Sequence, residues 1–146
     1  MRSALYGAVA MASLLLAGGA HAVMAPQYYE EARDSAAYHL EVEITAMRQV
    51  SGEAIGTCRV EAVVVSVLRD GSATLQAGDP VAFNVDCLRA GADPSEIPSC
   101  VLLQRAERLV DGALVDVYLN KAGEGYSVPL GQVGIINAPS AAEGAS

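Results

Sequence analysis

The segment at residues 59–69, with the sequence RVEAVVVSVLR, constrains the fold of this chain more than any other. Val60 and Ala62 share one face of the expected strand, opposite to Arg59 and Glu61. After an all-apolar stretch the alternation continues on the other parity, at Val63, Val65 and Val67. Because successive strand side chains point to opposite faces, a change of parity indicates a β-bulge or strong coiling. A strand bent in this way favours a small closed barrel.

Four further segments predict strands, and turn residues separate them. Apolar and polar residues alternate most cleanly at residues 38–47, and similar patterns follow at residues 81–87, 113–119 and 126–136. Residues 70–79 contain Asp-Gly and Gly-Asp-Pro turn signals, so the second and third strands are expected to form a hairpin. Short helices are expected within residues 23–37 and 104–111. The predicted fold class is therefore all-β, a five-stranded OB-like barrel with a short N-terminal helix and a small helix between strands 3 and 4.

The first 22 residues predict a signal peptide. Arg2 precedes an apolar run at residues 4–17, and Ala-His-Ala at residues 20–22 forms a small-residue cleavage site. The run is too short to span a bilayer, so we expect no integral membrane segment after processing. Residues 23–136 then form a single barrel domain, and the tail at residues 137–146, rich in Ala, Ser and Gly, is expected to be disordered. These features predict a periplasmic or secreted protein.

The charge of the chain argues against nucleic-acid binding. Its formal net charge is −8, and loss of Arg2 with the signal peptide makes it more negative by one. No cluster of Lys or Arg reverses this sign locally, and an acidic surface repels phosphate backbones. A basic or neutral partner is expected instead.

Three cysteines in an exported chain predict either one disulfide with one spare thiol or no disulfide at all. The predicted hairpin brings Cys58 close to Cys87 on the facing strand, and this pairing is the first hypothesis. Cys87 with Cys100 closes a shorter loop and stays open as the alternative, because connectivity does not follow from sequence alone.

Three short segments are similar to small exported barrels of the netrin-module and metalloprotease-inhibitor type. They are Gly56-x-Cys58-x-Val60, residues 78–81 (Gly-Asp-Pro-Val) and residues 117–119 (Val-Tyr-Leu). The resemblance covers residues 38–136 by strand order. In that inhibitor family the mature chain begins with a cysteine that chelates the zinc of the target protease. Here the predicted mature chain begins with Val23, so the resemblance does not imply inhibitory activity.

Few residues could support catalysis. His39 is the only histidine after residue 22, and it shares one strand face with Glu41 and Glu43, which could bind a metal but are better explained as a solvated polar face. An unpaired thiol such as Cys100 could act with His39, yet no flanking signature accompanies it. The chain also lacks a Gly-x-Ser-x-Gly elbow and a phosphate-binding loop. We therefore expect no catalytic residue, no metal and no cofactor.

These observations favour a non-enzymatic binding or protein-interaction module. OB-type barrels bind ligands on the face of strands 2 and 3. The outward residues expected on that face are Arg59, Glu61, Asn84 and Asp86, and the expected partner is a peptide, protein or glycan. One alternative is a small hydrolase or metal-dependent enzyme that uses His39. A second is a structural accessory of an envelope complex, docked through the last strand with its Pro129 break.

Overall fold

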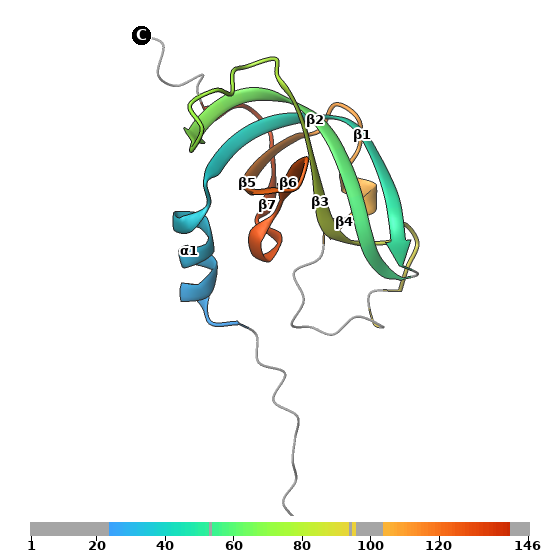
Figure 1. The fold of residues 1–146 in the computed structure, drawn as a ribbon. Helices are drawn as coiled ribbons and strands as arrows, with labels where there is room; N and C mark the ends of the chain where they lie inside the picture. The colour runs from blue at the N-terminus through green and yellow to red at the C-terminus, as the bar shows by residue number, and fades with distance from the viewer. Residues whose placement is uncertain (1–23, 53, 94, 96–103, 141–146) are drawn as a thin grey trace, which may run out of the picture.

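The computed structural model describes residues 24–52, 54–93, 95 and 104–140. Strands dominate this part of the chain (Figure 1). They are β1 (Tyr38–Gly52), β2 (Ile55–Asp70), β3 (Pro80–Leu88), β4 (Gln104–Arg105), β5 (Leu114–Ala122), β6 (Gly125–Ser127) and β7 (Val133–Ile136). One α-helix, α1 (Pro26–Ser35), precedes them, and single 3-10 turns form η2 (Ala106–Arg108) and η3 (Pro129–Gly131).

Five of the strands close into a barrel. The sheet runs in the order β1-β2-β3-β6-β5, and β5 pairs with β1 to complete the ring. The β3–β6 pair is parallel, whereas the other four pairs of the ring are antiparallel. β4 adds to β3, and β7 adds to β5. This small closed barrel confirms the all-β fold class and is compatible with an OB-like barrel.

The change of parity predicted on β2 is present, but it lies later in the strand than expected. The pairing of β1 with β2 places Val64 opposite Val42 and Ser66 opposite Glu41, so one residue of β2 is skipped. Val64 is therefore buried with the inward residues that precede it, whereas the skipped Val65 is only half-buried. The expectation that Val63 and Val65 point inward was wrong, because the bulge follows Val64 rather than Ala62.

The barrel interior is filled by apolar side chains from every long strand. Its fully buried large side chains include Leu40, Ile44, Val60, Phe83, Val117 and Leu119. Leu109, just after η2, also belongs to this core and is 1% exposed. The small helix expected at residues 104–111 is therefore a single 3-10 turn, because Gln104 and Arg105 pair with β3 instead.

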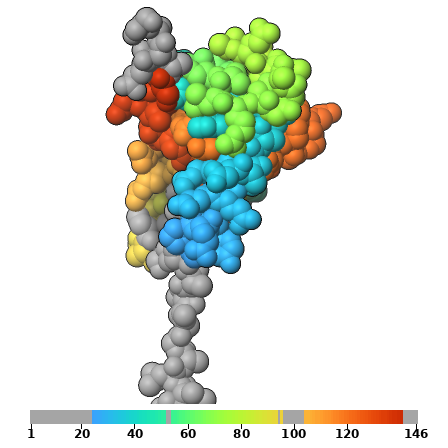
Figure 2. Space-filling view, turned by 90° about the vertical axis from the view of Figure 1, so that its left-hand side faces the viewer, coloured from blue at the N-terminus to red at the C-terminus, as the bar shows by residue number. Residues whose placement is uncertain are grey.

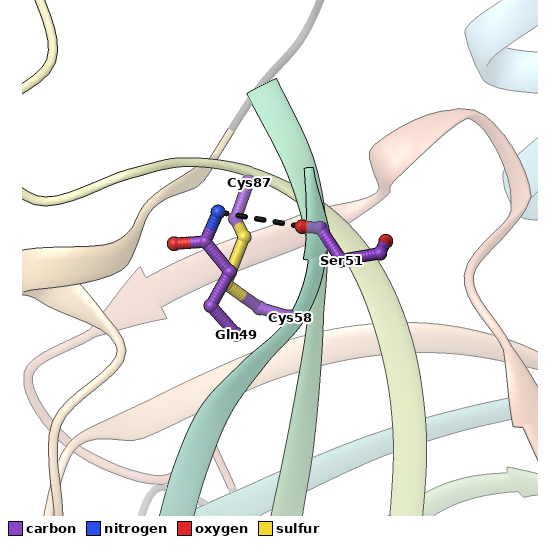
Figure 3. Close-up of a disulfide and its surroundings, with 4 residues drawn as sticks. All are labelled: Gln49, Ser51, Cys58 and Cys87. Carbon is purple, nitrogen blue, oxygen red and sulfur yellow. Dashed lines mark hydrogen bonds between the residues drawn. A yellow bond between two sulfur atoms is a disulfide. The ribbon is translucent and has the colours of Figure 1, made fainter. Parts of the chain in front are cut away.

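A disulfide joins β2 to β3 inside the barrel. It links Cys58 to Cys87, whose Cα atoms lie 5.7 Å apart, and both residues are fully buried (Figure 3). The hairpin prediction is thus confirmed, whereas Cys100, the partner in the alternative pairing, lies outside the described residues. With a sequence separation of 29 between the two cysteines, the bond contributes about 3–4 kcal/mol on the chain-entropy model.

Both ends of the described chain lie against the barrel. The C-terminal end of α1 is held by Arg69, which donates hydrogen bonds to the carbonyl oxygens of Arg33 and Ala36. At the other end, Ser140 contacts Glu41 of β1. Figure 2 shows α1 and the C-terminal residues on the same face of the molecule.

The predicted processing segment and most of the predicted tail cannot be compared with the structure. Residues 1–22 and 141–146 lie outside the described residues. Residues 137–140, which the sequence assigned to the tail, are placed on the barrel through Ser140. No helix of the described chain is long and apolar enough to cross a membrane.

Candidate functional site

The four residues predicted to form a binding surface all point outward from β2 and β3. Arg59 lies directly opposite Asn84 in the pairing of these strands, and Asp86 lies opposite Thr57. Glu61, Asn84 and Asp86 are exposed, and Arg59 is half-buried. The alternation of each strand was sufficient to predict their orientation, because the barrel interior takes the residues of the other parity.

Arg48 of β1 extends this surface, and sequence reasoning missed it. It is exposed and pairs with Arg59, so Arg48, Arg59 and Asn84 form a row across three strands. Only the β1–β2 register, with its bulges, brings the two arginines together. We call Arg48, Arg59, Glu61, Asn84 and Asp86 the β2–β3 face.

The polar groups of the β2–β3 face are available to a ligand. None of its five side chains makes a hydrogen bond or an ion pair with another described residue. Like charges directly opposite each other on neighbouring strands are unfavourable, so the pairing of Arg48 with Arg59 costs stability unless an anion lies between them. An anionic or acceptor-rich ligand would remove this cost.

Two hollows flank Glu61 on the β2–β3 face. The smaller, of about 220 Å³, is lined by Ala46, Met47, Arg48, Arg59 and Glu61. The larger, of about 340 Å³, reaches from Glu61 to Glu124 and Tyr126, beside the turn that joins β5 to β6. The face is therefore a shaped surface with recesses on both sides of Glu61.

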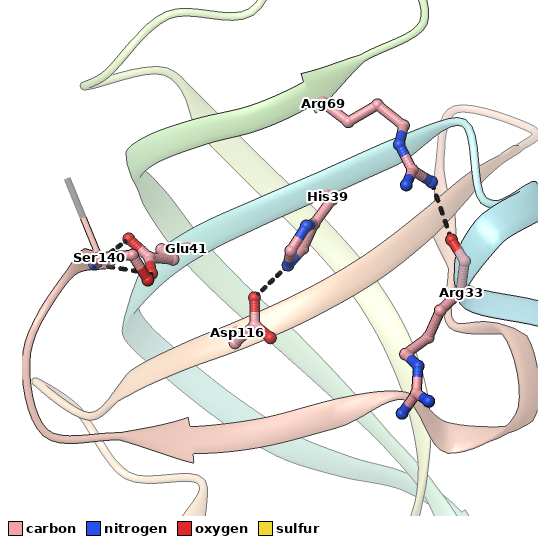
Figure 4. A network of polar contacts seen from close by, with 6 residues as sticks. All are labelled: Arg33, His39, Glu41, Arg69, Asp116 and Ser140. Atoms are coloured by element: carbon pink, nitrogen blue, oxygen red, sulfur yellow. Dashed lines mark hydrogen bonds and ion pairs between the residues drawn. The ribbon is translucent and has the colours of Figure 1, made fainter. Parts of the chain in front are cut away.

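His39, the residue on which an enzymatic function would depend, lies at the seam where β1 meets β5. Its Nε2 atom lies 2.5 Å from Oδ1 of Asp116, and its ring stacks on Tyr118 with 4.0 Å between ring centroids (Figure 4). The side chain of His39 is 19% exposed and that of Asp116 is 31% exposed. Sequence reasoning did not pair His39 with Asp116, because the two residues are 77 positions apart and meet only when the barrel closes.

Glu41 was expected on a solvated strand face, but it is only 1% exposed. The amide of Ser140 donates to both carboxylate oxygens, at 2.8 and 3.0 Å, and the Ser140 hydroxyl donates to Oε1 as well. Burial raises the pKa of Glu41, but hydrogen bonds from Ser140 and Ser66, with a smaller effect of His39, together hold this pKa below its usual value. Glu41 thus remains ionised and anchors residues 137–140.

The metal site considered from the sequence does not assemble. Glu41 is committed to Ser140, and Glu43 is exposed. Among the described residues, no three His, Cys, Asp or Glu side chains lie close enough together to hold a metal ion. The thiol hypothesis rested on Cys100, which lies outside the described residues.

Comparison with known proteins adds no assignment. No protein-family model matches the chain, and no curated protein is significantly similar to it. The geometry of the barrel is therefore the basis for assigning a function.

Proposed function

We propose that this protein is an exported, non-enzymatic binding module whose β2–β3 face recognises a peptide, protein or glycan. The observation that carries the proposal is the row formed by Arg48, Arg59 and Asn84, whose side chains have no partner among the described residues. Two guanidinium groups and an amide provide many donors on one exposed surface. Such a row suits a ligand rich in carboxylate, carbonyl or hydroxyl oxygens.

The position of the face in the fold supports the same proposal. OB-type barrels commonly bind ligands on strands 2 and 3 and on the loop between strands 4 and 5. In this barrel β5 and β6 correspond to strands 4 and 5 of an OB-type barrel. The turn that connects β5 to β6 borders the larger hollow beside Glu61. This support is an analogy between folds, because the same fold serves many functions.

Export and the netrin-module relationship belong to the proposal as well. Export rests on residues 1–22 and is consistent with the buried Cys58–Cys87 disulfide, since disulfides persist in oxidising compartments. The netrin-type relationship rests on the three short segments around Gly56, Gly78 and Val117. Because Val23 rather than cysteine begins the predicted mature chain, we do not propose protease inhibition.

A pull-down from cell-envelope extract, followed by affinity measurement with the recovered partner, tests this function. We expect Arg48→Ala and Arg59→Ala each to weaken binding by about tenfold or more, as loss of a charge-assisted contact would. Arg108→Ala removes an exposed arginine on η2 and serves as the matched control, with unchanged affinity. Equal affinities for the wild type and both face variants would contradict the proposal.

A second candidate, a small hydrolase that uses His39, is favoured by the ion pair with Asp116. A carboxylate that orients a histidine is a recurring part of hydrolytic sites. No Ser, Thr or Cys side chain among the described residues makes a hydrogen bond with His39, so the described part of the chain shows no nucleophile bonded to this histidine. A His39→Ala variant that retains the hydrolytic activity of the wild type would dispose of it.

A further inference from the structure

A cavity of about 410 Å³ opens between α1, η3 and the strands β5 and β7, away from the β2–β3 face. Its lining residues are Arg33, Gln104, Asp116, Tyr118 and residues 131–134. Its volume falls in the range of small-molecule sites, and its walls combine charged, aromatic and backbone groups. The residues come from five separate elements, α1, β4, β5, η3 and β7, which only the closed barrel brings together.

Contacts with neighbouring residues hold several side chains of this cavity in place. His39 binds Oδ1 of Asp116 and stacks on Tyr118, so both residues are fixed on the β5 wall. Gln104 Nε2 donates to the Val133 carbonyl at 2.9 Å. Such supporting contacts hold a site in its binding geometry before a ligand arrives.

Arg33 is positioned through its own backbone. Arg69 Nη1 donates to the carbonyl oxygens of Arg33 and Ala36, both at 2.8 Å, and so fixes the end of α1. The Arg33 guanidinium points away from Arg69 in Figure 4. It makes no hydrogen bond or ion pair with another described side chain.

Opposite charges therefore line one cavity without neutralising each other. Arg33 and Asp116 do not form an ion pair, and Asp116 uses only Oδ1 for His39. Its second oxygen points away from His39 in Figure 4. A charge at the wall of a cavity is stabilised by a partner of opposite sign, so each group offers a separate contact to a ligand.

The backbone beside the cavity is strained. Leu130, with φ 48°, and Gly131, with φ 64°, are two consecutive residues in the left-handed region. Leucine rarely adopts this conformation, and strained backbone clusters at sites that hold ligands. The turn places Gly131 and Gln132 on the cavity wall. The Gln132 amide donates to the Pro129 carbonyl and the Gln132 carbonyl accepts from the Tyr118 amide, so this part of the wall is fixed by backbone hydrogen bonds.

We propose that this cavity binds a small zwitterion of amino-acid or dipeptide size. Arg33 binds its carboxylate, and Asp116 Oδ2 binds its ammonium group. The His39 ring, which stacks on Tyr118, holds Asp116 in place through its contact with Oδ1. This site is independent of the β2–β3 face and of any partner bound there.

Titration of the isotopically labelled protein with glycylglycine, followed by NMR, tests the proposal. We expect saturable shifts at the amides of Tyr118, Gln132 and Gly134. N-acetylglycylglycine lacks the ammonium group and glycylglycinamide lacks the carboxylate. The affinity of each should therefore be at least about tenfold lower than that of glycylglycine. Absence of saturable shifts with glycylglycine, or equal binding of the three probes, would overturn the zwitterion site.

Two variants connect the binding to Arg33. Arg33→Gln should weaken glycylglycine binding by about tenfold, because the carboxylate loses its charged partner. Arg108→Gln, on η2 outside the cavity, should bind as the wild type does. Unchanged amide shifts far from the cavity, for example at Asn84, show that Arg33→Gln is folded. A folded Arg33→Gln protein with wild-type affinity would refute the role of Arg33.

Discussion

Glu41 shows how far alternation can predict the environment of a single residue. Its position in the strand predicted that the side chain points out of the barrel, and it does. The burial of Glu41 could not be predicted from its place in the strand. Residues 137–140, almost a hundred positions away, cover the carboxylate through Ser140. These four residues, Asn-Ala-Pro-Ser, have no periodic pattern that could reveal such a contact.

The Glu41→Gln variant tests this anchor. The amide replaces one acceptor oxygen with a donor that faces the Ser140 amide and hydroxyl, so we expect a loss of about 1–3 kcal/mol in the free energy of unfolding. Urea denaturation measures the change. Glu43→Gln, an exposed position two residues further along β1, is the matched control and should stay within about 0.5 kcal/mol of the wild type. Equal losses in the two variants would show that Ser140 does not hold Glu41.

At the scale of the element, β2 decides how the barrel curves. The existence of a bulge was predictable from residues 59–69, because a strand cannot keep one face inward while its apolar residues change parity. The position of the bulge was not predictable. The five consecutive apolar or small residues from Ala62 to Ser66 are compatible with either set of inward-facing positions. Only the pairing with β1 determines which residue is skipped.

A pair of matched truncations tests the position of the bulge. Val64 is 2% exposed and points into the core, so Val64→Ala should cost about 2 kcal/mol through lost burial and an unfilled cavity. Val65 is skipped in the pairing and half-buried, so Val65→Ala should cost clearly less. Urea denaturation of both variants gives the comparison. If Val65→Ala lowered the free energy of unfolding more than Val64→Ala, the bulge would lie where the sequence predicted it, before Val63.

At the scale of the whole molecule, the closed five-stranded barrel and the Cys58–Cys87 bond were predictable from local patterns. The total number of strands was not, because β4 carries no pattern of its own and η3 divides the strand expected at residues 126–136 into β6 and β7. The candidate site was predictable only in part. Arg59, Glu61, Asn84 and Asp86 follow from alternation within single strands. Arg48 opposite Arg59, and Asp116 beside His39, depend on register between strands, which alternation within one strand does not specify. The zwitterion cavity likewise depends on contacts between distant segments, since residues of five elements line it.

The dependence of stability on pH is also a property of the whole fold. Desolvation raises the pKa of Asp70, but hydrogen bonds from the Ser72 hydroxyl and from the amides of Leu75, Ser72 and Thr74 outweigh it and lower the pKa from 3.8 to about 2. The pKa of Glu41 is lowered as well. Carboxyl groups with lowered pKa in the folded state stabilise it fully above their unfolded values, and this stabilisation is lost as the pH falls.

We therefore expect the free energy of unfolding to stay constant as the pH is lowered to about 5 and to decrease between about pH 4.5 and pH 2. Urea denaturation at a series of pH values measures this profile. Asp70→Asn should be less stable than the wild type at pH 7, and the two curves should converge as the pH falls through about 2, where Asp70 of the folded wild type takes up its proton. Parallel curves for the two proteins over this range would show that Asp70 does not contribute to the pH dependence.

The seam between β1 and β5 has a consequence for the time course of folding. β1 lies near the beginning of the described chain, yet its second neighbour is β5, and the His39–Asp116 contact spans 77 residues. Native contacts of such high sequence separation slow folding, typically to milliseconds or seconds in β-barrels. The ring cannot close before β5 has been synthesised. A nascent chain with this topology therefore keeps its barrel open at least until Ala122, the last residue of β5, has been synthesised.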